Sequence, residues 1–495
     1  MSRLRVQLEG GVQALTFALV VTVAFAASHI SPWNFSYARA MRWVALAELG
    51  LIAFALLVVR PYPRPHVRVV PPLVAGALLV ALGVASAAWA ADARFSIARA
   101  LSFGVLLVVA WAVAVGREGR PEAVGRILLG ILAAVAVITV AGVVELVHSY
   151  DQAVVPATRG QGARYSGIGE NPNQIAMLLA VSLPLALWGF AEVRSRAAKI
   201  AMGVLVAAFA VSLVASGSRG AIVGGFAASL AYLLVAYPRR RLVAAGVTAG
   251  VFAVSMVATT LPPRAKTEPV LNPAFGQTLP LSRFDVNSGL PLESEFGFPG
   301  ENAPARHRKL FFTSGRFQAW QGAVEQMAKR PLLGYGWGME DRAFVDRYYL
   351  FVSSRVENSY IGMLLQLGPL GLALLLAAIT TVLRAWWRGA PRLSPEAARV
   401  SAVCVGVVLG GVVLGIPQSY LTSVGSPATA PFWFALFLLG ALVDGAERER
   451  DEREEDAAQR HREAGLDVMR SEHDGVRGEQ HDRPATGSAA GERER

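Results

Sequence analysis

Long apolar runs with few or no charged residues recur along the chain, and they constrain its fold more than any other feature. Twelve such runs are rich in Val, Leu and Ala, and each is close to the roughly 17–25 residues that cross a bilayer as a helix. Helices and closed barrels both satisfy the backbone hydrogen bonds in lipid, but barrel strands alternate polar and apolar residues, and these runs do not. The sequence therefore predicts an all-α polytopic membrane protein with about twelve transmembrane helices.

One long polar interval, residues 262–355, separates the ninth predicted span from the tenth. It divides the chain into spans one to nine within residues 1–261, a large extracytoplasmic loop, spans ten to twelve within residues 356–446, and a tail at 447–495. The tail mixes Arg and Glu without aromatic residues, so it is predicted to be disordered. The predicted spans lie at residues 12–28, 43–59, 69–91, 97–115, 127–147, 174–190, 200–215, 220–236, 242–261, 359–382, 400–416 and 428–443.

The overall composition agrees with a membrane protein. Only 17% of the residues are charged and 54% are hydrophobic, whereas a soluble domain carries roughly 25% charged residues. A net charge of +11 would suit nucleic acid, but the Arg residues gather in short loops between apolar runs, as membrane orientation requires. We therefore predict no nucleic-acid partner. The single cysteine, Cys404, excludes an intramolecular disulfide.

Positive charges in every second loop predict the orientation. They occur in five successive loops, at residues 60–68, 117–126, 194–199, 239–241 and 384–392, whereas the loop at 417–427 has no charge. The positive-inside rule then places both termini in the cytoplasm and residues 262–355 outside. The first run follows a basic N-terminus and is predicted to be an uncleaved span rather than a signal peptide.

The second half of the large loop is predicted to contain an amphipathic helix near residues 315–330. Phe317, Trp320, Val324 and Met327 fall on one helical face, which would lie on the lipid surface or cover the bundle. Arg316 stands in the first turn, where the helix dipole favours an acid rather than a cation. This mismatch indicates another task for Arg316, such as binding an anion.

A second candidate anion site is the short turn Ser-Gly-Ser-Arg-Gly-Ala at 216–221. Ser216 and Ser218 are suitable N-caps for the following span, and a helix N-terminus attracts anions. Arg219 adds a cation whose fork geometry suits phosphate oxygens. An arginine that only extends to the lipid headgroups explains the same pattern equally well.

Two further polar stretches are candidates for substrate contact. Arg164 and the run containing Asn171 and Asn173 precede the sixth span, where Asn173 is predicted to cap the helix, although both amides suit sugar hydroxyls. Glu357 precedes the tenth span, where it fits either first-turn acid placement or a general base at the lipid–water boundary. No His or Asp cluster on the outer side suggests a metal site, so no metal or cofactor is predicted.

Taken in chain order, these motifs resemble the O-antigen ligase and O-antigen polymerase superfamily of bacterial membrane glycosyltransferases. The resemblance covers about residues 169–371. Its motifs are Gly-Glu-Asn-Pro-Asn-Gln at 169–174, the turn at 216–221, Gly-Arg-Phe-Gln-Ala-Trp at 315–320, Pro-Leu-Leu-Gly-Tyr-Gly-Trp-Gly at 331–338, and Glu-Asn-Ser-Tyr at 357–360 followed by Leu-Gly-Pro-Leu-Gly at 367–371.

The resemblance implies metal-independent, inverting transfer of glycan from an undecaprenyl-diphosphate carrier to a hydroxyl acceptor. The transfer would take place on the outer face of the bacterial cytoplasmic membrane. Arg219 and Arg316 would bind the diphosphate, and Glu357 would act as the base. Residues predicted to contact the substrates are Arg164, Asn171, Asn173, Asn358 and Tyr360. Partners would be the lipid-linked glycan, a glycan, lipid or protein acceptor, membrane lipid and other polysaccharide-assembly proteins.

Glu357 departs from the family pattern, because ligases of this family commonly carry His at that position. A carboxylate can still activate a hydroxyl, so a ligase, a chain polymerase and a protein O-glycosylating enzyme stay open, with a slight preference for polysaccharide assembly. The alternative from another class is a transporter or flippase for the lipid-linked glycan. Such a protein would hold ionisable residues deep within its spans, whereas Glu48 and Glu145 lie near predicted helix ends.

Overall fold

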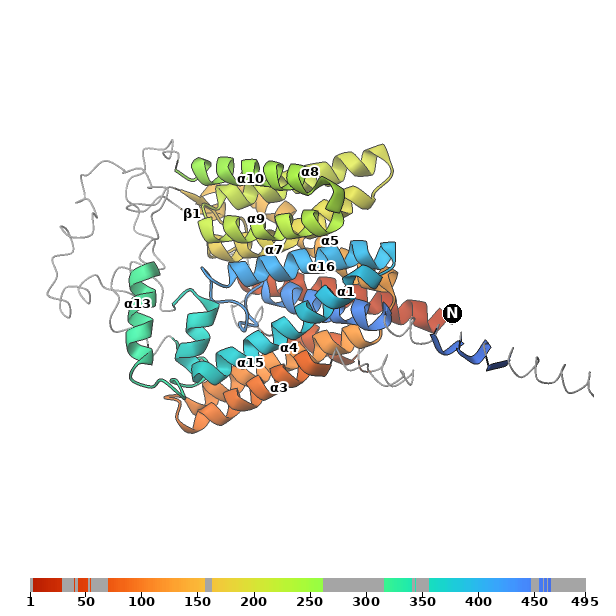
Figure 1. Ribbon diagram of the computed structural model, residues 1–495. Coiled ribbons are helices and arrows are strands. Elements are labelled where there is room, and N and C mark those ends of the chain that lie inside the picture. Colours follow the sequence, from red (N-terminus) through yellow and green to blue (C-terminus); the bar gives the residue numbers. More distant parts are fainter. Residues whose placement is uncertain are drawn as a thin grey trace, which may run out of the picture.

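The described part of the chain forms an elongated bundle of helices (Figure 1). The computed structural model describes residues 3–28, 40, 43–51, 54, 70–155, 163–260, 316–340, 343, 356–446, 454–456, 458–460 and 462–463. The first half of the predicted large loop, part of the predicted second span and most of the predicted tail lie outside these residues. The described helices alternate in direction between the two ends of the bundle, and α1 begins at the end opposite α13 (Figure 1).

The helices follow the apolar runs closely. In the first half they are α1 (Arg3–Ala26), α3 (Val70–Ala85) with η1 (Ser86–Ala88), α4 (Ala93–Val115), α5 (Pro121–His148), α6 (Tyr150–Ala153), α7 (Pro172–Glu192), α8 (Arg196–Ala215), α9 (Arg219–Ala236), η2 (Pro238–Arg240) and α10 (Arg241–Ala258). The second half contains α13 (Arg316–Met327), α15 (Ser359–Gly389) with η3 (Ala390–Arg392), α16 (Pro395–Leu414) and the apolar helix Thr429–Ala446.

Ten of the described helices are long and apolar enough to cross a membrane, which makes the chain a multi-pass membrane protein. They overlap the third to the twelfth predicted spans. The first predicted span corresponds to the shorter apolar helix Gly10–Ala26, and residues 43–51 of the second are helical. The predicted total of twelve stays a prediction.

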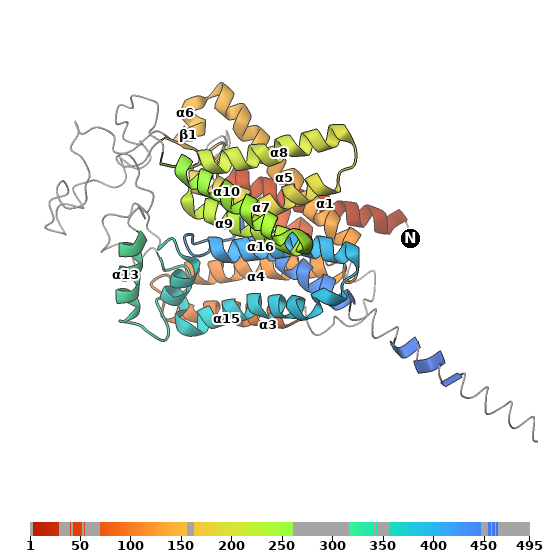
Figure 2. The same ribbon diagram turned by 45° about the horizontal axis from the view of Figure 1, so that its top comes forward.

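The helices of the bundle differ in how much of their apolar surface is buried. In the last helix, Thr429–Ala446, 94% of the apolar stretch is buried, whereas in the α10 region only 6% is buried. Small residues permit the closest contacts in membranes: a Cβ on Gly410 of α16 would collide with Ala228 of α9. α3 and α15 lie side by side along the other flank (Figure 2). The last helix is therefore the core, and α10 faces lipid.

A short hairpin stands before α7. β1 (Val154–Val155) pairs antiparallel with β2 (Arg164–Tyr165), with Val154 opposite Tyr165 and Val155 opposite Arg164. Gly167 lies against Gly142 of α5, and Gly169 forms a bridge with Ser28 at the end of α1. The hairpin thereby fixes Arg164 at the same end of the bundle as α13 (Figure 1).

α15 is broken within its length, and the break creates a docking point. Gly368 has φ 67°, and Pro369 lacks the N–H that would bond Leu365. The carbonyls of Leu365 and Gln366 instead accept hydrogen bonds from the backbone N–H groups of Tyr335 (3.0 Å) and Gly336 (2.8 Å). The glycine-aromatic turn after α13 thus satisfies carbonyls that a broken helix would leave bare in an apolar environment.

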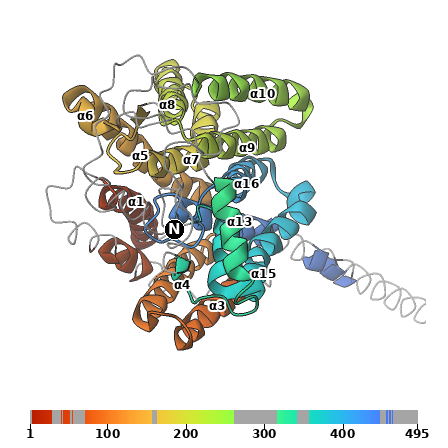
Figure 3. The ribbon, with the colours of Figure 1, turned by 90° about the vertical axis from the view of Figure 1, so that its left-hand side faces the viewer.

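α13 lies across the end of the bundle, over the start of α15 (Figure 3). Two residues of the predicted apolar face, Trp320 and Met327, pack against the buried cluster beneath this helix. Ala319 and Ala323 are fully buried, whereas Phe317 and Val324 are 62% and 51% exposed. Small side chains occupy the contact because they allow close approach of the helices, and the large apolar residues are left at the rim. Arg316 falls on the packed side.

We expect Gly368→Ala to lower the thermal unfolding midpoint of the full-length protein in detergent. The added methyl would collide with the carbonyl of Leu332, at a backbone angle that L-residues disfavour. Gly246→Ala is the matched control, because nothing lies within 4 Å of that Cβ position in α10. Equal midpoints for the two variants would contradict this account of the break.

Candidate active site

Glu357 lies in a backbone conformation that is costly for its residue type. Among the described residues it is the one non-glycine with positive φ, at 54°. Such a residue costs of order 1–3 kcal/mol and persists only where its surroundings impose it. Directly after it, Asn358 caps α15 by accepting hydrogen bonds from the N–H groups of Tyr360 and Ile361. The cap fixes where the helix begins and leaves Glu357 at its mouth.

The neighbours of Glu357 are held on both sides. The N–H of Val356 donates to Glu340 Oε1 at 2.6 Å, and the carbonyl of Val356 accepts from Trp320 Nε1 at 3.1 Å. On the other side, the N–H of Asn358 donates to Ser419 Oγ at 2.9 Å. These bonds account for the unusual conformation of Glu357, because they fix the chain immediately before and after it.

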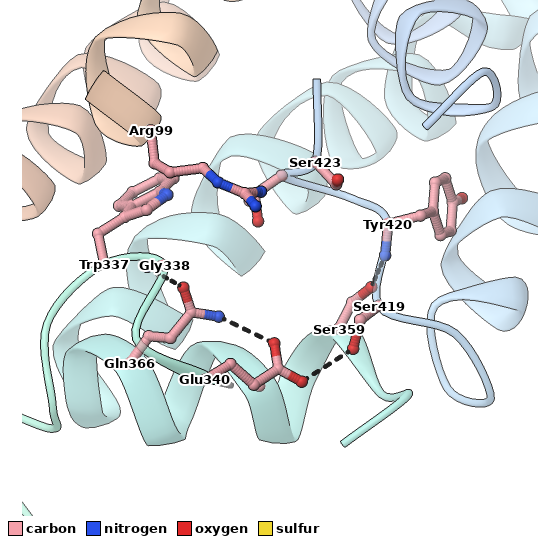
Figure 4. A pocket seen from close by; sticks show the side chains of 11 residues that line it. Arg99, Trp337, Gly338, Glu340, Ser359, Gln366, Ser419, Tyr420 and Ser423 are labelled. Atoms are coloured by element: carbon pink, nitrogen blue, oxygen red, sulfur yellow. Dashed lines mark hydrogen bonds between the residues drawn. The ribbon is translucent and has the colours of Figure 1, made fainter. Parts of the chain in front are cut away.

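Glu340 was not singled out in the sequence, although it directly follows the glycine-aromatic turn. It is 6% exposed, and its second oxygen accepts from Gln366 Nε2 at 3.3 Å, while Ser419 Oγ lies 3.3 Å from the first (Figure 4). Gln366 Oε1 in turn accepts from the N–H of Gly338. The carboxylate of Glu340 therefore joins the turn, α15 and the loop after α16.

α13 brings its first residue to Glu357. Trp320 donates to Val356, and one turn earlier Arg316 Nη2 lies 3.6 Å from Glu357 Oε2. The two side chains are only 18% and 19% exposed. The Nε of Arg316 is buried and makes no hydrogen bond within the described part of the chain. This geometry presents a cation and a carboxylate together at the end of the bundle.

Arg164 is a second cation of the same cluster. Its Nε donates to the carbonyl of Ser216 (2.7 Å) and its Nη2 donates to Asn173 Oδ1 (2.6 Å). Burial, the largest cause, and the neighbouring Arg316 lower its pKa to about 10, whereas Glu357 raises it. Since that pKa is three units above neutral pH, Arg164 stays charged at pH 7. The repulsion between Arg164 and Arg316 is a smaller contribution, and a bound anion would relieve it.

The two asparagines before α7 have different tasks from those expected. Asn171, not Asn173, is the N-cap: its Oδ1 accepts from the N–H of Asn173, and Pro172 follows at the first helical position, which it suits. The expectation that Asn173 caps the helix is therefore wrong. Asn173 instead holds Arg164, so both amides are engaged within the protein.

Arg219 begins α9 and is 9% exposed, with its Nε donating to Thr259 Oγ1 at 3.0 Å. Ser218 occupies the N-cap position without a side-chain cap bond, and the Ser216 hydroxyl accepts from the N–H of Ser218. Arg164 binds the carbonyl of Ser216, three residues before Arg219. The turn therefore connects the two arginines.

The loop after α16 joins Arg219 to the Glu357 segment. Pro417 packs against Gly220, and the carbonyl of Gln418 accepts from the N–H of Ser359. Gln418 is 2% exposed, and its Nε2 has no hydrogen-bond partner among the described residues. This uncharged loop carried no sequence signal beyond its lack of charge, yet it places the N-termini of α9 and α15 together.

Tyr360 points elsewhere. Its hydroxyl donates to the carbonyl of Val412 in α16 at 2.6 Å. That bond ties α15 to α16 and gives the phenol a structural partner inside the bundle. Of the predicted residues, the structure thus brings Arg164, Arg316 and Glu357 together. Arg219 lies three residues after Ser216, whose carbonyl accepts from Arg164. The side-chain oxygens of Asn171, Asn173, Asn358 and Tyr360 are engaged in hydrogen bonds within the protein.

The fold and this cluster define a multi-pass helical membrane protein with a cationic, carboxylate-bearing site at one end of its bundle. No group of three His, Cys, Asp or Glu side chains suited to a metal occurs in the described ranges. Residues 204–376 match the family model described as O-Antigen ligase, and no curated protein matches the chain. The match confirms the predicted resemblance: the chain carries an O-antigen ligase family domain, which supports a membrane glycosyltransferase-like enzyme at the family level. The matched region includes Arg219, Arg316 and Glu357 and excludes Arg164.

We expect Glu357→Gly to unfold at a higher temperature than Glu357→Ala, because both lose the carboxylate but only glycine adopts φ 54° freely. The difference should be about 1–2 kcal/mol, measured by thermal unfolding of the full-length protein in detergent. The same pair at Glu325, exposed within α13, should show the opposite order, since glycine weakens a helix interior. The same order at both positions would show that the backbone at Glu357 is not strained.

Proposed function

We propose that the protein transfers a glycan from undecaprenyl diphosphate to a hydroxyl acceptor on the outer face of the bacterial cytoplasmic membrane. The observation that carries the proposal is the Arg316–Glu357 pair beside Arg164, within and next to the region that matches the O-antigen ligase family. Several cations around one carboxylate suit a diphosphate leaving group and a base that activates a hydroxyl.

In the proposed reaction, Glu357 takes the proton of the acceptor hydroxyl. The hydroxyl oxygen attacks the anomeric carbon from the face opposite the diphosphate, and the bond between that carbon and the phosphate oxygen breaks. The electron pair leaves with the diphosphate, so the anomeric configuration inverts. Arg316, Arg219 and Arg164 offset the charge that develops on the diphosphate.

The contact between Arg316 and Glu357 supports a coupling between these events. While Glu357 is ionised, it offsets part of the charge of Arg316 at 3.6 Å. When Glu357 becomes protonated, that attraction is lost at the moment the leaving diphosphate gains charge. Arg316 is then electrostatically available to the leaving group. Asn173 takes part indirectly, because it holds Arg164.

We expect Arg316→Ala to lower the transfer rate by about 10²–10³-fold and Glu357→Gln by about 10²–10⁴-fold. The assay uses the full-length protein in proteoliposomes with undecaprenyl-diphosphate-linked glycan and a hydroxyl acceptor. Arg219→Ala should behave like Arg316→Ala. The matched control is Arg330→Ala, because Arg330 is exposed and stacks 5.0 Å from the Tyr335 ring.

Full transfer by both Arg219→Ala and Arg316→Ala, at unchanged expression, would refute the proposal. Movement of the lipid-linked glycan across liposomes without any transfer would favour a transporter instead.

Transfer should also continue when divalent cations are removed with EDTA, because arginines supply the positive charge in the proposed reaction. The rates before and after chelation, measured on the same proteoliposomes, test this point. A loss that added Mg²⁺ or Mn²⁺ restores would place a metal in the reaction and contradict the proposed mechanism.

A further inference from the structure

A polar pocket lies beside the candidate active site (Figure 4). It is formed by α4, the glycine-aromatic turn, the start of α15 and the loop after α16. Its polar side chains include Arg99, Glu340, Gln366, Ser419, Thr422 and Ser423. Arg99 comes from α4, which precedes the region that matches the family model.

One wall of this pocket carries two hydroxyls and a guanidinium. Within the described part of the chain, the hydroxyls of Thr422 and Ser423 make no hydrogen bond, and both residues are half-buried. The guanidinium of Arg99 extends towards Ser423 (Figure 4), and its Cζ lies 4.9 Å from the centre of the Phe95 ring. The opposite wall consists of the Glu340–Gln366 pair.

The pocket and Glu357 share one short segment of chain. Ser359 lines the pocket, and Glu340 in its wall accepts from the N–H of Val356, directly before Glu357. In contrast, Arg164, Arg219 and Arg316 are not among the residues that line it. A ligand there would therefore adjoin the proposed base without occupying the cationic cluster.

We propose that this pocket binds a hydroxyl-bearing sugar unit of the acceptor glycan. A sugar both donates and accepts hydrogen bonds, and the pocket supplies a carboxylate, an amide, a guanidinium and two hydroxyls for that purpose. A second diphosphate would meet the buried carboxylate of Glu340, which disfavours an anion. The donor diphosphate belongs with the arginines, so the sugar next to Glu357 is the one whose hydroxyl is to be activated.

The inference rests on the proposed function for its assignment to the acceptor, but sugar binding can be measured separately. The chain has a single cysteine, Cys404, which is buried. Ser423→Cys therefore introduces one accessible thiol at the pocket wall. The experiment follows its alkylation by N-ethylmaleimide in the full-length protein in nanodiscs, with the unsubstituted protein as the background.

The probes are the methyl glycosides of glucose, galactose, mannose, rhamnose and N-acetylglucosamine, with sodium pyrophosphate for comparison. At least one glycoside should slow alkylation at millimolar concentration, and pyrophosphate should not. Adding Arg99→Ala should raise the protecting concentration at least tenfold. Adding Arg94→Ala, an exposed arginine on the same helix, should leave it unchanged.

The inference is overturned if no glycoside protects the thiol, if pyrophosphate protects it equally, or if Arg99→Ala leaves protection intact. In the transfer assay, Arg99→Ala alone should raise the KM for the acceptor and leave the KM for the donor unchanged. A raised donor KM instead would assign the pocket to the donor glycan and also overturn the inference. The two proposals can fail separately. Full transfer activity of Arg316→Ala refutes the proposed function, whereas a thiol that no glycoside protects refutes the pocket assignment alone. Thiol protection that persists in Arg316→Ala shows that the pocket is separate from the diphosphate site.

Discussion

The two backbone hydrogen bonds of Val356 hold the candidate site together. The carbonyl of Val356 accepts from Trp320 and so fixes α13 over the bundle, and the N–H of Val356 donates to Glu340 and so fixes the glycine-aromatic turn. Because Arg316 lies one helical turn before Trp320, the same bonds set its distance to Glu357. The cost of the positive φ at Glu357 is offset by these surrounding contacts. The cation and the carboxylate are therefore positioned by backbone contacts rather than by their own 3.6 Å attraction, which is modest for partly exposed groups.

The break in α15 provides the anchor for this arrangement. A proline within a helix exposes carbonyls, and in an apolar environment these need partners. The turn at residues 334–338 supplies its N–H groups to Leu365 and Gln366. Its side chains then form one wall of the polar pocket, while the loop after α16 forms another. The helix defect, the turn and the pocket thus depend on one another, and a methyl group at Gly368 would disturb all three.

Electrostatics separates the two polar regions. Around Arg164, burial lowers the pKa of the guanidinium most, and the neighbouring Arg316 lowers it further because two cations lie close together. Around Glu340, a buried carboxylate is balanced by an amide, a hydroxyl and a backbone N–H. An anion is favoured in the first region and an uncharged polar ligand in the second. Glu357 adjoins both regions, because it lies beside Arg316 and because the N–H of the preceding Val356 donates to Glu340.

Much of this protein could be predicted from its sequence, because lipid leaves few choices. Apolar runs of bilayer length become helices, so the third to twelfth spans agree with the described helices within a few residues, and the ordered motifs predicted the family that the comparison confirmed. The sequence also drew attention to Arg164, Arg316 and Glu357, since charges are conspicuous beside apolar runs. It did not reveal Glu340, Gln418, the strain at Glu357 or the buried alanines of α13, and it misplaced the cap at Asn173. Those features depend on which segments meet: a carboxylate 16 residues before Val356, and small alanines that permit close approach. Local pattern determined the helices and the candidate charges, whereas only tertiary contact decided which charges share a site, because that depends on distances between segments far apart in the chain.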